Sequence, residues 1–432
     1  MKVLMRAAPL VLLTLLIACS TTEPQPGQLT VTSQHEKTIT CGEDPFTFDV
    51  LVEEVRGKVG PGADFLLYAP KDYDWRDLVV YAHGYVSTYS EVGFFGDDPD
   101  TDLLDEIELL RSGIVCPIPG FKEAYAAAFS SYSENGFAVK RGAQQTHQVT
   151  KLFTKRFGKP RHTFLAGASL GGGITTYLAE RFPSQYDGAL ALCGFVSGSV
   201  NQLTYLADTR NVFDYFYPGV LPEDALNVPE GLRFDDVAPS IIAAITAEAS
   251  ADPGLTVQKA LALASIEQIQ LPLQGLPPIP INYLEIIASM TESLLSALFY
   301  NIDGTNAFLE DTHGRSPYDN SETVYIYSNP LLSFPPIDLE HLNDNVARFE
   351  STPDARNYLK HYFTPTGKLK IPMVTMHTTG DPAVPFFHEA AYAEIVAQAG
   401  ATDMLQQIPI ERYGHCQFEL PEVIGAFTGL TT

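Results

Sequence analysis

Basic residues are scarce in this sequence. The 432-residue chain has 27 Lys and Arg against 52 Asp and Glu, which gives a formal net charge of −25. Surfaces that bind nucleic acid are basic because they neutralise phosphates, so this balance excludes nucleic acid as a partner. It also disfavours adsorption to an anionic membrane through basic patches. The remaining composition, 45% hydrophobic and 18% charged, excludes a disordered or fibrous chain.

Long hydrophobic runs are also missing, apart from one at the N-terminus. Residues 7–18 are apolar and follow Lys2 and Arg6, which is typical of an export signal, and the run is too short to span a bilayer. The segment Leu16-Ile17-Ala18-Cys19 resembles a bacterial lipobox. That resemblance implies removal of residues 1–18 and diacylation of Cys19, and two acyl chains suffice for stable anchoring.

The chain is therefore expected to be an exported, membrane-anchored lipoprotein of a bacterial cell envelope. Ser20 follows Cys19 where an Asp would indicate retention in the inner membrane, so the resemblance favours the outer membrane. An ordinary secretory peptide, cut at a small residue nearby, is the alternative, and it would give a secreted protein. Residues 19–45 are expected to form a lipidated tether, because the stretch 20–35 is polar and rich in Pro, Thr and Gln.

Cysteine is rare, with five residues in the chain. Four remain besides Cys19: Cys41, Cys116, Cys193 and Cys416. No CxxC or Cys/His spacing suggests zinc, so no metal site is predicted. Export permits disulfides, and structural bridging is the favoured interpretation. Four cysteines allow three pairings, and the sequence alone does not choose among them.

Short β-like hydrophobic runs alternate with longer helical patterns. This alternation predicts an α/β fold, with a mainly parallel sheet and helices on both faces. The predicted strands are 46–55, 63–69, 77–82, 124–131, 163–166, 189–193, 373–377 and 405–410. The helices expected between them are 142–157, 171–182 and 387–399.

One interval between the predicted strands is far longer than a loop. Residues 201–335 carry helical patterns of their own, so they are predicted to form a largely helical cap inserted after the sixth strand. Residues 46–200 and 336–432 are then one sheet domain. A cap at this point would cover the C-terminal ends of the strands, where open α/β sheets bind their ligands.

The motif that carries most information is Gly167-Ala168-Ser169-Leu170-Gly171. It follows a hydrophobic strand and leads directly into a helical pattern, which is the setting of a nucleophile elbow. Such a turn strains the backbone of the Ser and leaves little room beside it, which explains Gly167 and Gly171. Ser169 is therefore the predicted nucleophile.

Two further residues complete a predicted triad. Asp381 follows a hydrophobic strand, and His415 follows the last strand, so the chain order is Ser, acid, His. Alternatively, Asp381 only caps an Asx-turn and His415 is only a solvent-exposed loop residue. His377 lies inside a strand and is predicted to be a packed core residue.

An oxyanion hole is expected from two backbone N–H groups, those of Tyr85 and Leu170. Tyr85 follows the strand-to-loop sequence Ala82-His83-Gly84, and Leu170 follows the nucleophile. The helix that begins after Ser169 also directs its positive end at developing negative charge. His83 is expected to shape the loop rather than transfer protons.

Together, AHGY, GASLGG, TTGDP and GHC resemble the α/β-hydrolase fold, and more narrowly bacterial secreted esterases and prolyl-oligopeptidase-type serine hydrolases. The resemblance covers about residues 46–200 and 355–430 and implies a serine esterase that needs no cofactor. In tannases and fungal feruloyl esterases, a disulfide joins cysteines beside the Ser and the His. Ala168 occupies the first of these positions here, so the resemblance suggests Cys193 as the partner of Cys416, and leaves Cys41 with Cys116.

Three functions stay open at this point. The leading one is hydrolysis of small or polymeric carboxylic esters, and the runner-up is a serine peptidase acting on short peptides. The third is a binding lipoprotein on a catalytically dead scaffold. The apolar and aromatic cap residues are expected mainly to form the core of the cap, with a hydrophobic lid over the substrate as the alternative.

Overall fold

The computed structural model describes most of the chain that follows residue 28. The described residues are 29–42, 47–71, 77–94, 114–116, 124–266, 283–327 and 337–431. The expected lipidation site Cys19 and the export segment 1–18 lie outside these ranges. Within these ranges, no helix combines the length and the apolar character that a membrane span requires.

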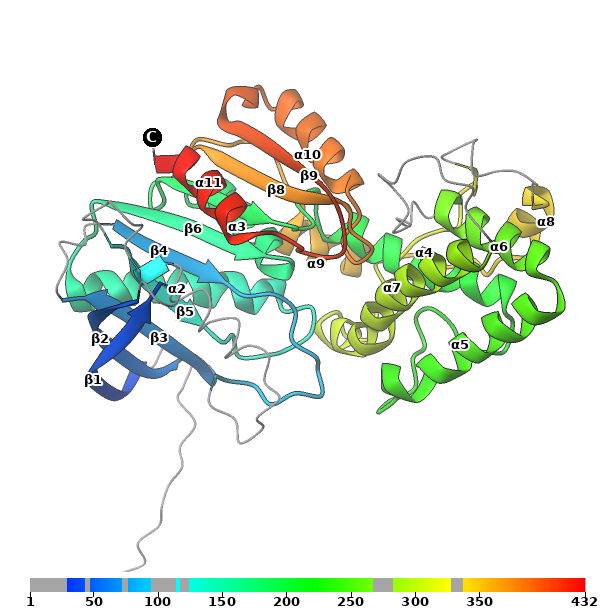
Figure 1. Ribbon diagram of the computed structural model, residues 1–432, viewed down its shortest axis with the longest axis horizontal. Helices are drawn as coiled ribbons and strands as arrows, with labels where there is room; N and C mark the ends of the chain where they lie inside the picture. Colours follow the sequence, from blue (N-terminus) through cyan, green and yellow to red (C-terminus); the bar gives the residue numbers. More distant parts are fainter. Residues whose placement is uncertain are drawn as a thin grey trace, which may run out of the picture.

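A nine-stranded sheet forms the centre of the molecule (Figure 1). Its spatial order is β1-β2-β3-β5-β4-β6-β7-β8-β9, with antiparallel pairing from β1 to β5 and parallel pairing from β5 to β9. The strands are β1 (Leu29–Cys41), β2 (Phe48–Val59), β3 (Ala63–Pro70), β4 (Asp77–Ala82), β5 (Ala126–Ser130), β6 (His162–Ala168), β7 (Gly188–Leu192), β8 (Met373–Gly380) and β9 (Leu405–Tyr413).

Strand β1 corrects the predicted tether. Residues 19–45 were expected to be a flexible link, but Leu29–Cys41 pairs along its whole length with β2. The segment contains alternating Thr, Val and Ile, which favour extended backbone, and its polarity suits an edge strand with mostly exposed side chains. A disulfide joins Cys41 to Cys116, with a Cα–Cα distance of 5.6 Å.

Helices cover both faces of the sheet. One face packs against α2 (Val139–Phe157), α3 (Leu170–Arg181) and α10 (Phe387–Gln398), and the opposite face packs against α11 (Leu420–Thr431). This mainly parallel sheet, with a sharp turn between β6 and α3, has the α/β-hydrolase fold that the sequence predicts.

The cap is a helical unit inserted between β7 and β8, beyond one end of the sheet (Figure 1). Its helices are α4 (Ser199–Phe216), α5 (Phe234–Ala251), α6 (Pro253–Ile266), α7 (Tyr283–Asp311) and α8 (Leu339–Asn345), and α9 (Pro353–Phe363) returns the chain to the sheet. The cap extends past the boundary expected at residue 335, because Leu342 and Val346 are buried in its core. The insertion follows the seventh strand rather than the sixth, because β1 adds one.

Candidate active site

Ser169 lies in a strained turn between β6 and α3. Its backbone angles are φ 55° and ψ −119°, a conformation that L-residues rarely adopt. A side chain on Gly171 would lie 1.9 Å from the carbonyl oxygen of Ala82, and one on Gly167 would lie 2.4 Å from that of Gly171. These two contacts explain why both positions are glycine.

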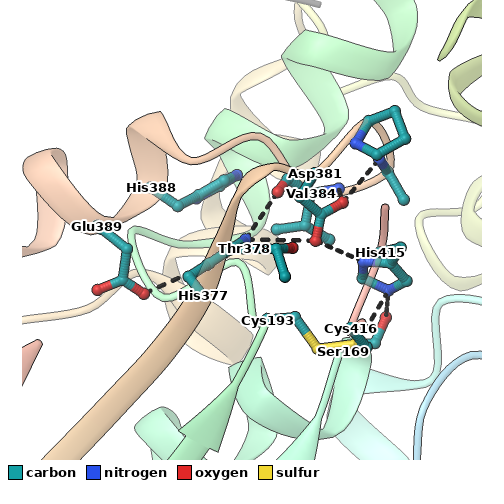
Figure 2. Close-up of polar contacts among 12 residues, drawn as sticks. Ser169, Cys193, His377, Thr378, Asp381, Val384, His388, Glu389, His415 and Cys416 are labelled. Atoms are coloured by element: carbon teal, nitrogen blue, oxygen red, sulfur yellow. Dashed lines mark hydrogen bonds and ion pairs between the residues drawn. A yellow bond between two sulfur atoms is a disulfide. The ribbon is translucent and has the colours of Figure 1, made fainter. Parts of the chain in front are cut away.

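His415 and Asp381 lie beside Ser169 (Figure 2). The Nε2 atom of His415 is 2.8 Å from the Ser169 Oγ, and its Nδ1 atom is 2.7 Å from Oδ2 of Asp381. Because a carboxylate only accepts, Nδ1 carries a proton, and the unprotonated Nε2 accepts the hydrogen bond from the Ser169 hydroxyl. The structure therefore brings together the three residues that the sequence selected from separate strand ends.

Asp381 makes the contacts expected for both of the interpretations that the sequence left open. Its Oδ1 accepts hydrogen bonds from the backbone N–H groups of Ala383 and Val384, both at 2.9 Å, as a turn-capping residue would. Its Oδ2 faces His415. Burial by itself raises the pKa of this carboxyl group, but His415 and His377 outweigh it and hold the pKa at about 2. Asp381 is therefore a buried anion.

Two hydrogen bonds and a disulfide fix the loop that carries His415. Gly414 has a φ of 105°, its N–H donates to the carbonyl of Gly380 at 3.0 Å, and its own carbonyl accepts from the Thr378 hydroxyl at 2.6 Å. A disulfide joins Cys416 to Cys193 at the end of β7, with a Cα–Cα distance of 5.3 Å. With Cys41–Cys116, this is the pairing suggested above.

The expected oxyanion-hole residues lie near the nucleophile. Leu170 is the first residue of α3, where the backbone N–H groups lack helical partners. A Cβ on Gly84 would lie 3.7 Å from that of Ser169, so the start of the Tyr85 loop is close to the hydroxyl. The same loop is tied to the cap, because the Ser87 hydroxyl donates to Asp303 of α7 at 3.1 Å.

His83 is buried, and its contacts lie outside the series Ser169–His415–Asp381. Its ring stacks on Tyr132 with centroids 3.7 Å apart, and its Nδ1 lies 2.8 Å from the carbonyl oxygen of Gly84. Burial lowers the pKa of His83 to about 4, so the ring is neutral. These contacts agree with the expected role in shaping the loop.

A cavity opens above Ser169, between the sheet domain and the cap. It measures about 750 Å³, counting the part open to solvent. The side chains that line it from the sheet domain include Tyr85, Phe137 and Phe195. Those that line it from the cap include Leu203 of α4 and Tyr300 and Phe308 of α7. Among the described residues that line it, none is Asp, Glu, Lys, Arg or His. The cavity is therefore apolar and aromatic, with few polar groups.

Most of the aromatic cap residues pack inside the cap, as the sequence analysis favoured. Phe213, Phe216 and Leu294 are buried in the cap core, whereas Leu284 is 70% exposed. Tyr300 and Phe308 are exceptions, because both line the cavity, and the Tyr300 ring lies 6.5 Å from that of His415.

Sequence reasoning missed one feature of the site. His377 is buried, as expected for a core residue, but its Nε2 lies 3.4 Å from Oδ2 of Asp381 and 2.8 Å from the carbonyl oxygen of Val384. The sequence signal that could have found this contact is the spacing: His377 lies in β8, four residues before Asp381, which follows the end of that strand. The sequence alone does not show that the two side chains point the same way.

One group in the described part of the chain has the proximity of metal ligands: Cys193, His415 and Cys416. The two cysteine sulfurs are bonded to each other, so neither is available as a thiolate ligand.

Comparisons with known proteins found no matching family model. The chain is 20% identical over 352 residues to o-phthalyl amidase from Xanthobacter agilis, covering 71% of this chain and 78% of that protein. Solved structures similar to the chain include an esterase from Aspergillus oryzae (13% identity, TM-score 0.42, 90% of this chain and 80% of the other). They also include the rice cell wall degrading esterase LipA from Xanthomonas oryzae (14%, 0.42, 91% and 92%) and tannin acyl hydrolase from Aspergillus niger (12%, 0.43, 93% and 83%).

Proposed function

We propose that the protein is a serine hydrolase that cleaves carboxylic esters through an acyl-enzyme. The single observation that carries this proposal is the hydrogen-bonded series from Ser169 through His415 to the buried anion Asp381. A serine hydroxyl held against an imidazole, with the other ring nitrogen held by a carboxylate, is the arrangement that activates a serine nucleophile.

In the proposed reaction, the Ser169 oxygen attacks the ester carbonyl while its proton passes to Nε2 of His415. The carbonyl oxygen becomes an oxyanion, for which the N–H groups of Tyr85 and Leu170 are the proposed donors. When the tetrahedral intermediate collapses, His415 returns the proton to the leaving alkoxide and the acyl group remains on Ser169. Water then gives its proton to His415 and attacks the acyl-enzyme, releasing the acid and restoring the serine hydroxyl.

The lining of the cavity favours substrates whose bound portion is uncharged. Burying a charge without a partner is costly, and the described lining residues offer no acidic or basic side chain to pair with one. We therefore propose neutral esters with apolar or aromatic groups as the preferred class.

Amide hydrolysis is the second candidate, because the chain is 20% identical to an o-phthalyl amidase. The same triad can attack an amide carbonyl, whose leaving group needs the proton from His415 even more. For the peptidase alternative, the described cavity lining offers no carboxylate to bind a peptide amine.

A substrate panel separates these candidates. We expect full-length protein to hydrolyse p-nitrophenyl esters and to leave the matching anilides and aminoacyl anilides almost untouched. Comparable turnover of an anilide and its ester would favour the amidase instead. An alkyl phosphonate probe should label Ser169, and folded protein that neither reacts with the probe nor cleaves any substrate would favour the binding lipoprotein.

Replacing the nucleophile tests the triad directly. Ser169→Ala should reduce ester turnover to background, while the melting temperature stays nearly unchanged because only one partly exposed oxygen is lost. The matched control is Ser199→Ala, since the Ser199 hydroxyl is buried without a hydrogen-bond partner. Turnover by Ser169→Ala above the level of a buffer blank would mean that the nucleophile is another residue.

Export and lipid anchoring through Cys19 are a separate part of the proposal. Two disulfides in the described chain fit an oxidising compartment. If anchoring is correct, Cys19→Ala should release the protein from the membrane fraction of a bacterial host, and Ser20→Asp should move it from the outer to the inner membrane. Unchanged fractionation of Cys19→Ala would refute the lipid anchor.

A further inference from the structure

A series of polar contacts continues behind Asp381 (Figure 2). Oδ2 of Asp381 lies 2.7 Å from Nδ1 of His415 and 3.4 Å from Nε2 of His377. On its far side, Nδ1 of His377 lies 3.3 Å from Oε1 of Glu389, the third residue of α10. His377 and Asp381 are fully buried, and Glu389 is nearly so. Four ionisable groups therefore form one line from His415 inward.

The partners of His377 determine its protonation. Nε2 faces the carbonyl oxygen of Val384 at 2.8 Å, and a carbonyl only accepts, so this nitrogen carries a proton. Nδ1 faces a carboxylate that also accepts from Thr375 and Gln407, so this nitrogen carries a proton as well. Burial lowers the pKa of His377, but Asp381 and Glu389 outweigh it and raise the pKa to about 10. The ring is an imidazolium.

We propose that His377 is a positioning residue for the hydrolysis, held by Glu389 so that it orients Asp381 and balances part of the buried negative charge behind His415. The proposal rests on the proposed function, since it assigns a role beside that triad. His377 is not among the residues that line the cavity, so it acts through Asp381 and not on the substrate.

The charge of His377 sets the net charge that lies behind His415. Asp381 and Glu389 contribute two negative charges and His377 one positive charge, so a net charge of −1 faces His415 when it accepts the proton of Ser169. A larger negative charge would keep His415 protonated at rest, and a smaller one would weaken its stabilisation in the transition state.

Within the described residues, the other titratable groups that face this line are uncharged. Tyr392 of α10 is neutral, because burial and the nearby Glu180 and Glu389 raise its pKa well above the ordinary value. His388 of α10 is within hydrogen-bond distance of Ser197 at Nδ1 and Gln202 at Nε2, and burial lowers its pKa well below the ordinary value. Tyr300 of α7 and Tyr413 of β9 are neutral, because burial raises the pKa of each to about 12.

A charge cycle on full-length protein tests the proposal. The variants are His377→Gln, Glu389→Gln and the double variant, and the measurement is the pH profile of kcat/KM for a p-nitrophenyl ester. His377→Gln makes the buried charge −2, so the low-pH limb should move up by roughly one pH unit. Glu389→Gln makes the buried charge 0, so the low-pH limb should move down, by a smaller shift than the upward one in His377→Gln. The double variant restores −1, so the limb should return close to wild type.

The separate effects of His377→Gln on kcat and on KM give a second test. His377→Gln should lower kcat by roughly tenfold, because Asp381 is less well held, and should leave KM within about threefold. His388→Gln is the matched control: it removes an equally buried but neutral histidine, so it should lower the melting temperature without moving the limb.

Two results would overturn the proposal. One is a low-pH limb that stays in place in both single variants, and the other is a double variant shifted as far as His377→Gln, since a purely structural histidine would give either. If His377→Gln does not fold, the downward shift in Glu389→Gln decides alone. Failure of the proposed function is distinguishable, because it would appear as ester turnover in Ser169→Ala or as folded wild-type protein that cleaves no ester.

Discussion

In the sheet domain Asp381 is buried beside two histidines, whereas in the cap Asp208 is buried beside two tyrosines. The Tyr318 and Tyr325 hydroxyls donate to Oδ1 of Asp208 at 2.5 and 2.6 Å. Burial raises the pKa of Asp208, and neither these neutral donors nor the charge of Arg348 reverses that shift. The histidines do reverse it for Asp381, whose pKa is held at about 2.

The comparison shows that burial alone does not decide what a carboxyl group does. A partner that can carry positive charge keeps Asp381 ionised, next to a base that must become positive during the proposed reaction. The two tyrosine donors and the charge of Arg348 leave the pKa of Asp208 raised, and its carboxyl group accepts hydrogen bonds within the cap. The buried anion Asp381 therefore lies on the side of the cavity that holds Ser169, and the cap contributes no Asp, Glu, Lys, Arg or His to the described cavity lining.

Exchanging each aspartate for asparagine tests most strongly whether the two buried carboxyl groups differ in their importance for activity. Asp381→Asn should lower kcat by about 10⁴-fold, because the amide no longer fixes the His415 tautomer or stabilises its charged form. Asp208→Asn should leave kcat/KM within about threefold and shift the melting temperature by a few degrees, since an amide oxygen still accepts from both tyrosines. Equal losses of activity in the two variants would show that the contrast has no functional meaning.

The two disulfides differ in the same way. Cys193–Cys416 lies next to His415, whereas Cys41–Cys116 ties the edge strand β1 to the rest of the sheet domain. Replacing Cys193 and Cys416 together by Ala should lower kcat by roughly 10–100-fold, because the His415 loop loses a covalent anchor. Replacing Cys41 and Cys116 together should leave kcat nearly unchanged and cost roughly 2–5 kcal/mol of stability, measured by urea unfolding. Similar kcat values in the two double variants would count against positioning of the loop by its disulfide.

The cap side of the cavity should govern substrate size rather than chemistry. Leu203 is partly exposed and lines the cavity, so Leu203→Trp should narrow it. We expect kcat/KM for a benzoyl ester to fall by about tenfold while that for the acetyl ester stays nearly the same. Leu284→Trp, at an exposed cap position outside the cavity lining, is the control and should change neither. A parallel loss for both esters would instead indicate damage to the triad.

The smallest expected effect is on stability as pH rises. The pKa of His377 is raised from an ordinary 6.5 to about 10, so its stabilisation is complete below 6.5 and is lost as pH increases toward 10. The melting temperature of the wild type should therefore fall by a few degrees more than that of His377→Gln over this range, measured by calorimetry. Parallel curves would mean that His377 is not charged in the folded protein.

Much of the fold was accessible from local pattern. The strand at 77–82 has the predicted bounds, and the helices after β6 and β8 begin within a residue of the predicted positions. Edge strand β1 was missed because its exposed, polar side chains look like a tether until β2 pairs with it. The end of the cap was misplaced for a similar reason: only packing shows that Leu342 belongs to the cap core.

By itself, the sequence determined the nucleophile turn, the chain order of Ser169, Asp381 and His415, and the α/β fold, because each follows from local spacing and strand-to-loop transitions. Only the tertiary structure decided the 2.7 and 2.8 Å contacts that join these residues. It alone showed a cavity between sheet and cap whose described lining has no Asp, Glu, Lys, Arg or His, and it alone placed His377 behind Asp381. The physical reason is that charge state and cavity shape depend on neighbours that are distant in the chain, and those neighbours meet only when the strands and the cap have packed.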